Sequence, residues 1–189
     1  MNPGAAVADI GGVAYGLFPV AAAGEAGEER AQRTAAQFLD RVGTGFKAVA
    51  AVGPAAADAT ALAAARQGVD RILRVLRGAG QPGRVARLAD VQTEALLVDL
   101  GDLAAARGDP PVGPIARLID YDESADTHLV TTLRTWLATF GDAQAAAAQL
   151  FIHPNTLRYR LRRIAEVSGL DLTNPDERFA AELQLRILP

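Results

Sequence analysis

Residues 153 to 164, with the sequence HPNTLRYRLRRI, combine side chains that can recognise a polyanion. They place four arginines within six positions and no acid among them, in a chain whose formal net charge is −3. Arginine carries a rigid fork of donors that matches phosphates and base edges. Asn155 and Tyr159 lie among these arginines and can also form hydrogen bonds. A local basic segment in a mildly acidic protein indicates a confined nucleic-acid footprint.

The alternative is a helix face that is simply exposed to solvent, because most charged residues on helices lie on such faces. Two features favour recognition instead. No glutamate is interleaved among these arginines to form the usual surface ion pairs. A face that is merely solvated also rarely needs asparagine and tyrosine among its arginines.

The signals around this segment predict a helix from about 154 to 167. Pro154 suits the first helical position, so His153 becomes the cap. Ile152 then lies just outside and can pack on Leu157 as a hydrophobic staple, which fixes the angle at which the chain enters the helix. Gly169 offers the exit.

The predicted helix has an apolar and a polar face. Leu157, Leu161 and Ile164 fall on one stripe at about 100° per residue. The preceding helix, 143–150, offers Ala146, Ala147 and Leu150 for that stripe to pack on. A short helix, a turn from Leu150 to His153 and a second helix with a basic outward face form a helix-turn-helix.

The outward face supplies the predicted DNA-binding residues: Asn155, Thr156, Arg158, Tyr159, Arg162 and Arg163. The second helix of such a motif enters the major groove. Asn155 suits adenine, and Arg158 suits guanine or phosphate. Thr156 and Tyr159 can donate to phosphates, while Arg162 and Arg163 suit neutralisation of backbone charge.

Arg160 projects toward the flank of the apolar stripe and has a different predicted role. We expect it to be a structural ion-pair partner of Asp120, Asp122 or Asp142.

The rest of the chain divides into two parts by its predicted secondary structure. Up to about residue 90 the pattern is α+β, with strands at 5–10 and 13–20 joined by Gly11-Gly12, helices at 25–42 and 58–79, and short strands within 46–53 and 83–90. Beyond it we expect only helices, at 91–107, 127–140, 143–150 and from Pro175 onward, with a proline-rich break at 108–114.

Three local expectations concern the helices before the basic segment. The acidic stretch DYDESAD, 120–126, is expected to be a polar segment that leads into a helix. The 127–140 helix should bury Leu129, Leu133, Trp136, Leu137 and Phe140, and Gly141 is a suitable stop for it. Asp142 can cap the next helix, and Asn174 can cap the last one.

Composition argues against several classes of function. The chain has no cysteine, and its two histidines, His128 and His153, are far apart, so neither a metal site nor a cofactor site is expected. No phosphate-binding glycine loop or nucleophile with a histidine partner is present, so we do not expect an enzyme. No apolar run is long enough for a membrane span and no secretory signal is recognisable, which predicts a cytoplasmic protein.

The C-terminal part resembles a known family. From LIDYDESAD to the closing ELQLRIL, and above all in HPNTLRYRLRRI and SGLDLTNPDERF, residues 115 to 188 closely resemble the C-terminal helix-turn-helix domain of PucR/CdaR-type bacterial transcriptional regulators. The helix-turn-helix itself is similar to that of Fis. One departure is Phe151, where many such turns use glycine.

The front part is similar to a degenerate GGDEF fold. VADIGGVAYGLFP lines up with the two-glycine hairpin, and FKAVAAVGP looks like a later strand of that fold. Val13 and Ala14 stand where a working cyclase has acids, so no carboxylate there binds Mg²⁺. The resemblance implies a partial GGDEF-like domain at 1–90, a helical linker at 91–114 and a DNA-binding domain at 115–189. It also implies a piece of a longer regulator, whose missing upstream domain senses an unknown small-molecule effector.

The predicted function is that of a sequence-specific DNA-binding transcriptional regulator. Its partners are double-stranded DNA and, because one copy reads too few bases, a second or further copies of the chain. The GGDEF-like region and helix 91–107 are candidates for the oligomer interface. The alternative is a non-catalytic nucleotide- or protein-binding signalling or dimerisation module, which would lack salt-dependent affinity for duplex DNA.

Overall fold

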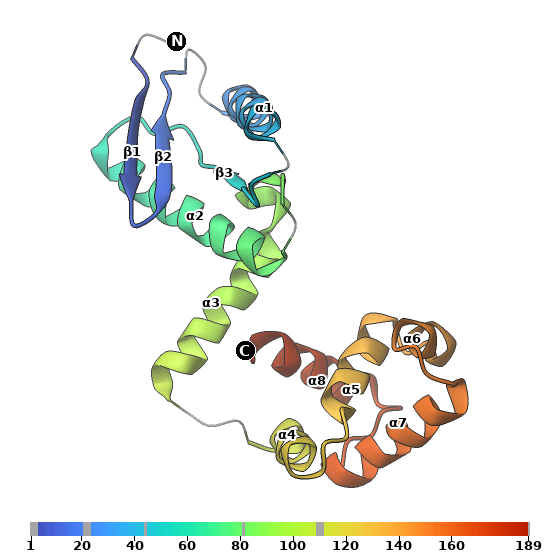
Figure 1. Ribbon diagram of the computed structural model, residues 1–189. Helices are drawn as coiled ribbons and strands as arrows, with labels where there is room; N and C mark the ends of the chain where they lie inside the picture. The colour runs from blue at the N-terminus through green and yellow to red at the C-terminus, as the bar shows by residue number, and fades with distance from the viewer. Residues whose placement is uncertain (1–3, 21–23, 44, 81, 109–111, 189) are drawn as a thin grey trace. The chain divides into compact units, whose positions relative to one another are not determined.

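The computed structural model describes residues 4–20, 24–43, 45–80, 82–108 and 112–188. The chain forms two compact units, Met1–Val98 and Asp99–Pro189. Helix α3, Gln92–Arg107, runs across the division (Figure 1). The predicted domain boundaries at residues 90 and 114 lie on either side of this division and stay a prediction.

The first unit begins with a β-hairpin. Strand β1, Ala6–Ile10, pairs antiparallel with β2, Val13–Leu17. Gly11 and Gly12 join them with φ angles of 62° and 77°, the positive values that a two-residue hairpin turn of type I′ requires. The predicted hairpin is therefore confirmed, with a shorter second strand than expected.

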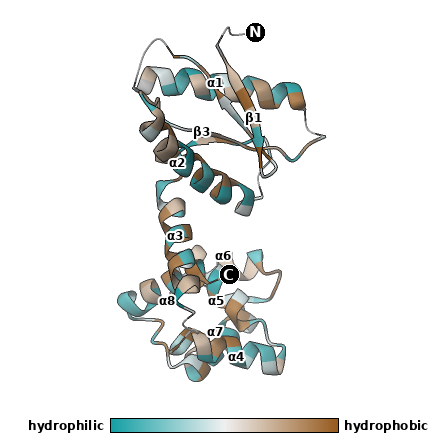
Figure 2. Cartoon of the chain, turned by 90° about the vertical axis from the view of Figure 1, so that its left-hand side faces the viewer, coloured by the Kyte–Doolittle hydropathy of each residue, from teal (hydrophilic) through white to brown (hydrophobic). Residues whose placement is uncertain are grey.

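The remainder of the first unit is built on a short sheet, which helices α1 and α2 both contact. The elements are α1, Glu25–Val42; β3, Ala50–Val52; α2, Ala59–Gly78; β4, Val85–Arg87; and a 3-10 turn, Leu88–Asp90. β3 and β4 pair parallel to each other, and the described strands form two separate two-stranded sheets. Along α1 and α2 in Figure 2, apolar and polar residues alternate, as expected of helices with one buried face.

The hairpin is fixed to α2 by one aromatic side chain. The hydroxyl of Tyr15 donates a hydrogen bond to Asp70, and the guanidinium of Arg66 lies 4.9 Å from the centre of the Tyr15 ring. A buried apolar cluster forms the core of the unit: Ile72, Val75, Leu76, Ala86, Val91 and Ala95. A lone two-stranded hairpin is marginal in water, so this attachment contributes to its stability.

Within its described residues, the second unit contains helices and no strand. It contains the second half of α3 followed by α4, Pro114–Ala125; α5, Leu129–Ala138; α6, Ala143–Gln149; α7, Pro154–Ser168; and α8, Pro175–Ile187. The predicted starts of α6, α7 and α8 are confirmed. Among the described residues, no helix is both long and apolar enough to span a membrane.

Two local predictions are wrong at the α4–α5 and α5–α6 junctions. DYDESAD does not lead into a helix but closes α4, and Asp126 ends it in a left-handed conformation. Helix α5 stops at Ala138, before the expected stop at Gly141, because Phe140 already adopts a φ of 56°. This turn also takes Phe140 off the apolar stripe, so its side chain is 97% exposed instead of buried.

Helix α7 is the centre of the second core. It contacts α4, α5 and α6. Leu157 and Ile164 are completely buried, and Leu161 is half-buried. Ala146 and Ala147 of α6 are also buried, and these small side chains allow the two helices to approach closely. The predicted apolar stripe of α7 and its packing surface are therefore confirmed.

The burial of Leu157 predicts a large effect on stability. Leu157→Ala should lower the free energy of unfolding by about 2–5 kcal/mol, because it removes buried contacts and leaves a cavity. Chemical denaturation followed by circular dichroism measures this loss. Phe179→Ala is the matched control, since that ring on α8 is 67% exposed and its removal should cost little. Equal losses in the two variants would contradict the packing described for α7.

Candidate nucleic-acid interface

Side-chain caps fix both helices of the α6–α7 pair. One carboxylate oxygen of Asp142 accepts hydrogen bonds from the backbone N–H groups of Gln144 and Ala145, at 2.8 and 3.1 Å. Nδ1 of His153 accepts one from the N–H of Asn155, at 3.2 Å, with Pro154 at the first helical position. The predicted roles of Asp142, His153 and Pro154 are confirmed, and they determine where α7 begins.

The side of α7 opposite its buried stripe faces solvent. Five of the predicted site residues are exposed there: Asn155, Thr156, Arg158, Tyr159 and Arg162. Arg158 and Asn155 are joined, because Nη1 of Arg158 donates to the amide oxygen of Asn155 at 2.7 Å. The site therefore presents these two side chains as a pair.

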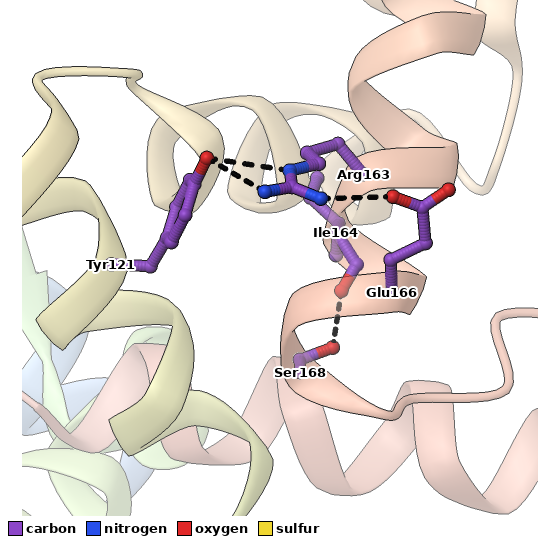
Figure 3. Close-up of polar contacts among 5 residues, drawn as sticks. All are labelled: Tyr121, Arg163, Ile164, Glu166 and Ser168. Carbon is purple, nitrogen blue, oxygen red and sulfur yellow. Dashed lines mark hydrogen bonds and ion pairs between the residues drawn. The ribbon is translucent and has the colours of Figure 1, made fainter.

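Arg163, the sixth predicted site residue, is half-buried and has partners within the protein (Figure 3). Its Nε and Nη2 donate to the hydroxyl of Tyr121 on α4, at 3.3 and 3.0 Å, and its Nη1 donates to Glu166 at 3.1 Å. The hydrogen bonds that Arg163 donates to Tyr121 and then to Glu166 raise its pKa above the ordinary value. Glu166 lies just beyond the basic segment, so this arginine does form a surface ion pair that the sequence analysis did not anticipate.

Arg160 has a structural role, as predicted, but the prediction that its partner is an aspartate is wrong. Its Nη1 donates to the hydroxyl of Thr132, a buried residue of α5, at 3.2 Å. Asp122 and Asp142 are already engaged as helix caps. Both oxygens of Asp122 accept backbone N–H groups at the start of α5, from Leu129 and Val130, at 2.8 Å each.

Helix α4 holds the C-terminal half of α7, and no sequence pattern predicted this contact. Arg117 donates from Nε and Nη2 to the carbonyl oxygen of Ser168, the last residue of α7. Tyr121, one turn further along α4, binds Arg163 as described above. Partners so far apart in the sequence leave no local pattern that could have revealed them.

The end of α7 is closed by Ser168. Its buried hydroxyl donates to the carbonyl of Ile164 at 2.6 Å and accepts from the N–H of Leu170 at 3.2 Å. Gly169 then leaves the helix with a φ of 73°, which favours glycine. The predicted exit at Gly169 is confirmed.

The described residues contain no group of three or more His, Cys, Asp or Glu side chains placed to hold a metal ion. The exposed side chains of α7 offer hydrogen-bond donors and positive charge.

A short helix, a tight turn and a second helix with an exposed basic face together define a helix-turn-helix domain. Residues 129–187 match the family described as the PucR C-terminal helix-turn-helix domain. The predicted class, a DNA-binding domain of transcriptional regulators, is confirmed for this part of the chain.

Several curated proteins are similar to the chain. An uncharacterized protein from the pkwA 5′ region of Thermomonospora curvata is 38% identical over 88 residues, which cover 47% of this chain and 47% of that protein. The DNA-binding transcriptional activator AdeR of Bacillus subtilis is 32% identical over 73 residues, covering 39% and 17%. The carbohydrate diacid regulator of Escherichia coli is 38% identical over 87 residues, covering 45% and 23%. The chain thus spans half or less of the length of these relatives.

The contact between Tyr121 and Arg163 predicts coupled effects on stability. Tyr121→Phe and Arg163→Gln should each lower the free energy of unfolding, and the double variant should lose less than the sum of the two. Chemical denaturation of the four proteins measures the coupling. Tyr159→Phe is the control, because it removes a hydroxyl from the exposed face of α7. Strict additivity of Tyr121→Phe and Arg163→Gln would contradict the contact.

Proposed function

We propose that the chain is the DNA-binding part of a sequence-specific transcriptional regulator that acts in the cytoplasm. The observation that carries this proposal is the two-sidedness of α7. Leu157 and Ile164 are completely buried, whereas Arg158, Tyr159 and Arg162 on the other side are exposed. An exposed row of arginines on the second helix of a helix-turn-helix is suited to the major groove of duplex DNA.

The N-terminal turn of α7 reads base edges in this proposal. Asn155 offers an amide that can pair with N6 and N7 of adenine, and Arg158 offers a fork that matches O6 and N7 of guanine. Their mutual hydrogen bond holds both side chains toward the same side before DNA binds. Pre-organisation of this kind lowers the entropy lost on binding.

The remaining site residues contact the phosphate backbone. Thr156 and Tyr159 donate from their hydroxyl groups, and Arg162 supplies charge. Arg163 contributes more weakly, because Tyr121 and Glu166 already occupy part of its guanidinium. These contacts release counterions, so the affinity should fall steeply as salt is added.

Two copies of the chain bind together on repeated half-sites in this proposal. One recognition helix reads only a few base pairs, and dimers of such domains bind half-sites about one helical turn, roughly 34 Å, apart. The first unit offers surfaces for self-association, because it exposes large apolar side chains such as Val7, Phe38 and Phe46, at 74%, 62% and 69%.

The same exposed side chains favour a second candidate role for the first unit, as a non-catalytic module that binds a nucleotide or a protein. The two-glycine hairpin with Val13 and Ala14 after it supports a degenerate GGDEF-like origin without cyclase chemistry. The likenesses to GGDEF and to Fis both stay predictions. This role is compatible with DNA binding by the second unit.

The proposal is tested by selecting bound duplexes from a random pool with the full chain. We expect enrichment of a consensus that contains two spaced copies of one short element. Failure to enrich any duplex at low salt would contradict the proposal.

Two arginine substitutions should distinguish a residue that recognises a base from one that only neutralises phosphate charge. Arg158→Ala should cost about 1–3 kcal/mol of binding free energy and relax the preference for one base pair. Arg162→Ala should weaken all duplexes about equally and lower the slope of log affinity against log salt by about 1. Fluorescence anisotropy across a salt series measures both.

Arg186→Ala is the matched control for these variants. Arg186 is an exposed arginine on α8 that pairs with Glu182, and it lies outside the outward face of α7. Its loss should leave affinity and slope unchanged. If Arg158→Ala and Arg162→Ala behave like this control while the fold persists, α7 does not bind DNA.

A further inference from the structure

Two phenylalanines flank α6, and each combines a left-handed backbone conformation with an almost fully exposed ring. Phe140 and Phe151 have φ angles of 56° and 53°, and their side chains are 97% and 96% exposed. The left-handed region is unfavourable for any residue with a Cβ atom, and glycine adopts it freely. Rings this exposed add no core packing that would compensate.

The turn between α6 and α7 is anchored without the Phe151 ring. The neighbouring side chains, Leu150 and Ile152, pack against the core and supply the apolar contacts of the turn. The backbone N–H of Phe151 donates to the carbonyl of Ala148 at 3.2 Å, and that of Ile152 donates to Ala147 at 3.0 Å. The ring of Phe151 is therefore an exposed group on a well-fixed backbone.

The position of Phe151 points to DNA as the partner of this ring. It lies two residues before His153, the cap of α7, and so at the end of the helix that approaches base edges in helix-turn-helix complexes. Phe140 lies at the other end of α6, two residues before the carboxylate of Asp142, which repels phosphates. Charge therefore favours Phe151 over Phe140 as the residue beside the duplex.

We propose that Phe151 reads a thymine by packing its ring on the C5-methyl group, beside the base pairs that Asn155 and Arg158 address. Apolar contact with this methyl group is how an aromatic side chain distinguishes thymine in the major groove. The inference rests on the proposed function and adds a specificity residue to it. An aromatic contact with a protein partner instead of DNA is the competing outcome of the test.

The test compares a selected duplex with the same duplex in which deoxyuridine replaces thymine, which removes only the methyl groups. We expect the unchanged protein to bind the uracil duplex roughly ten-fold more weakly, as for a typical single mismatch. Phe151→Gly should bind the thymine duplex about as weakly as the unchanged protein binds the uracil duplex, and it should no longer distinguish the two.

A melting temperature and a matched variant distinguish loss of the thymine contact from damage to the α6–α7 turn. Phe151→Gly should melt no lower than the unchanged protein, because glycine suits a positive φ. Phe140→Gly makes the same change at an equally exposed, left-handed position, and it should still distinguish thymine from uracil.

Three results would overturn the proposal. One is that Phe151→Gly still discriminates as the unchanged protein does, which leaves the ring for a protein partner. Another is that Phe140→Gly loses discrimination equally, and the third is that the unchanged protein binds both duplexes alike. If the unchanged protein binds no duplex, or if Arg158→Ala and Arg162→Ala both leave binding intact, the proposed function fails together with this inference.

Discussion

The packing of Leu157 and Ile164 into the second core is the constraint on which the rest of the site depends. Both side chains are fully buried, and they lie in one core with Ala146 and Ala147 of α6. Once this side of α7 is fixed, the helical repeat fixes the directions of all its other side chains. The exposed arginines are therefore a consequence of where the leucine and isoleucine must go.

The neighbouring helices divide the arginines of α7 into two groups. Arg160 and Arg163 bind Thr132 of α5 and Tyr121 of α4, while Arg158 and Arg162 remain exposed. Arg117 also donates a hydrogen bond to the last residue of α7. The helix is thus held along its length by side chains that the basic segment itself does not contain, and this rigidity favours accurate placement of the outward face.

The local features of this fold could be predicted from the sequence, because each depends on a few adjacent residues. Pro154 and Gly169 gave the bounds of α7, and Gly11-Gly12 gave the hairpin. Features that depend on distant contacts could not. The phenol that binds Arg163 is 42 residues away, and a carboxylate expected for Arg160 was already used as a cap. The exposure of Phe140 depends on a backbone reversal that helical periodicity cannot reveal.

The outward face of α7 is the surface that we propose meets DNA, and amide chemical shifts report such contact residue by residue. The isotope-labelled chain would be titrated with a selected duplex, and its two-dimensional 1H–15N spectra would be compared. We expect the largest changes on the N-terminal half of α7 and on the turn before it. Large changes confined to the first unit, with α7 unaffected, would contradict it.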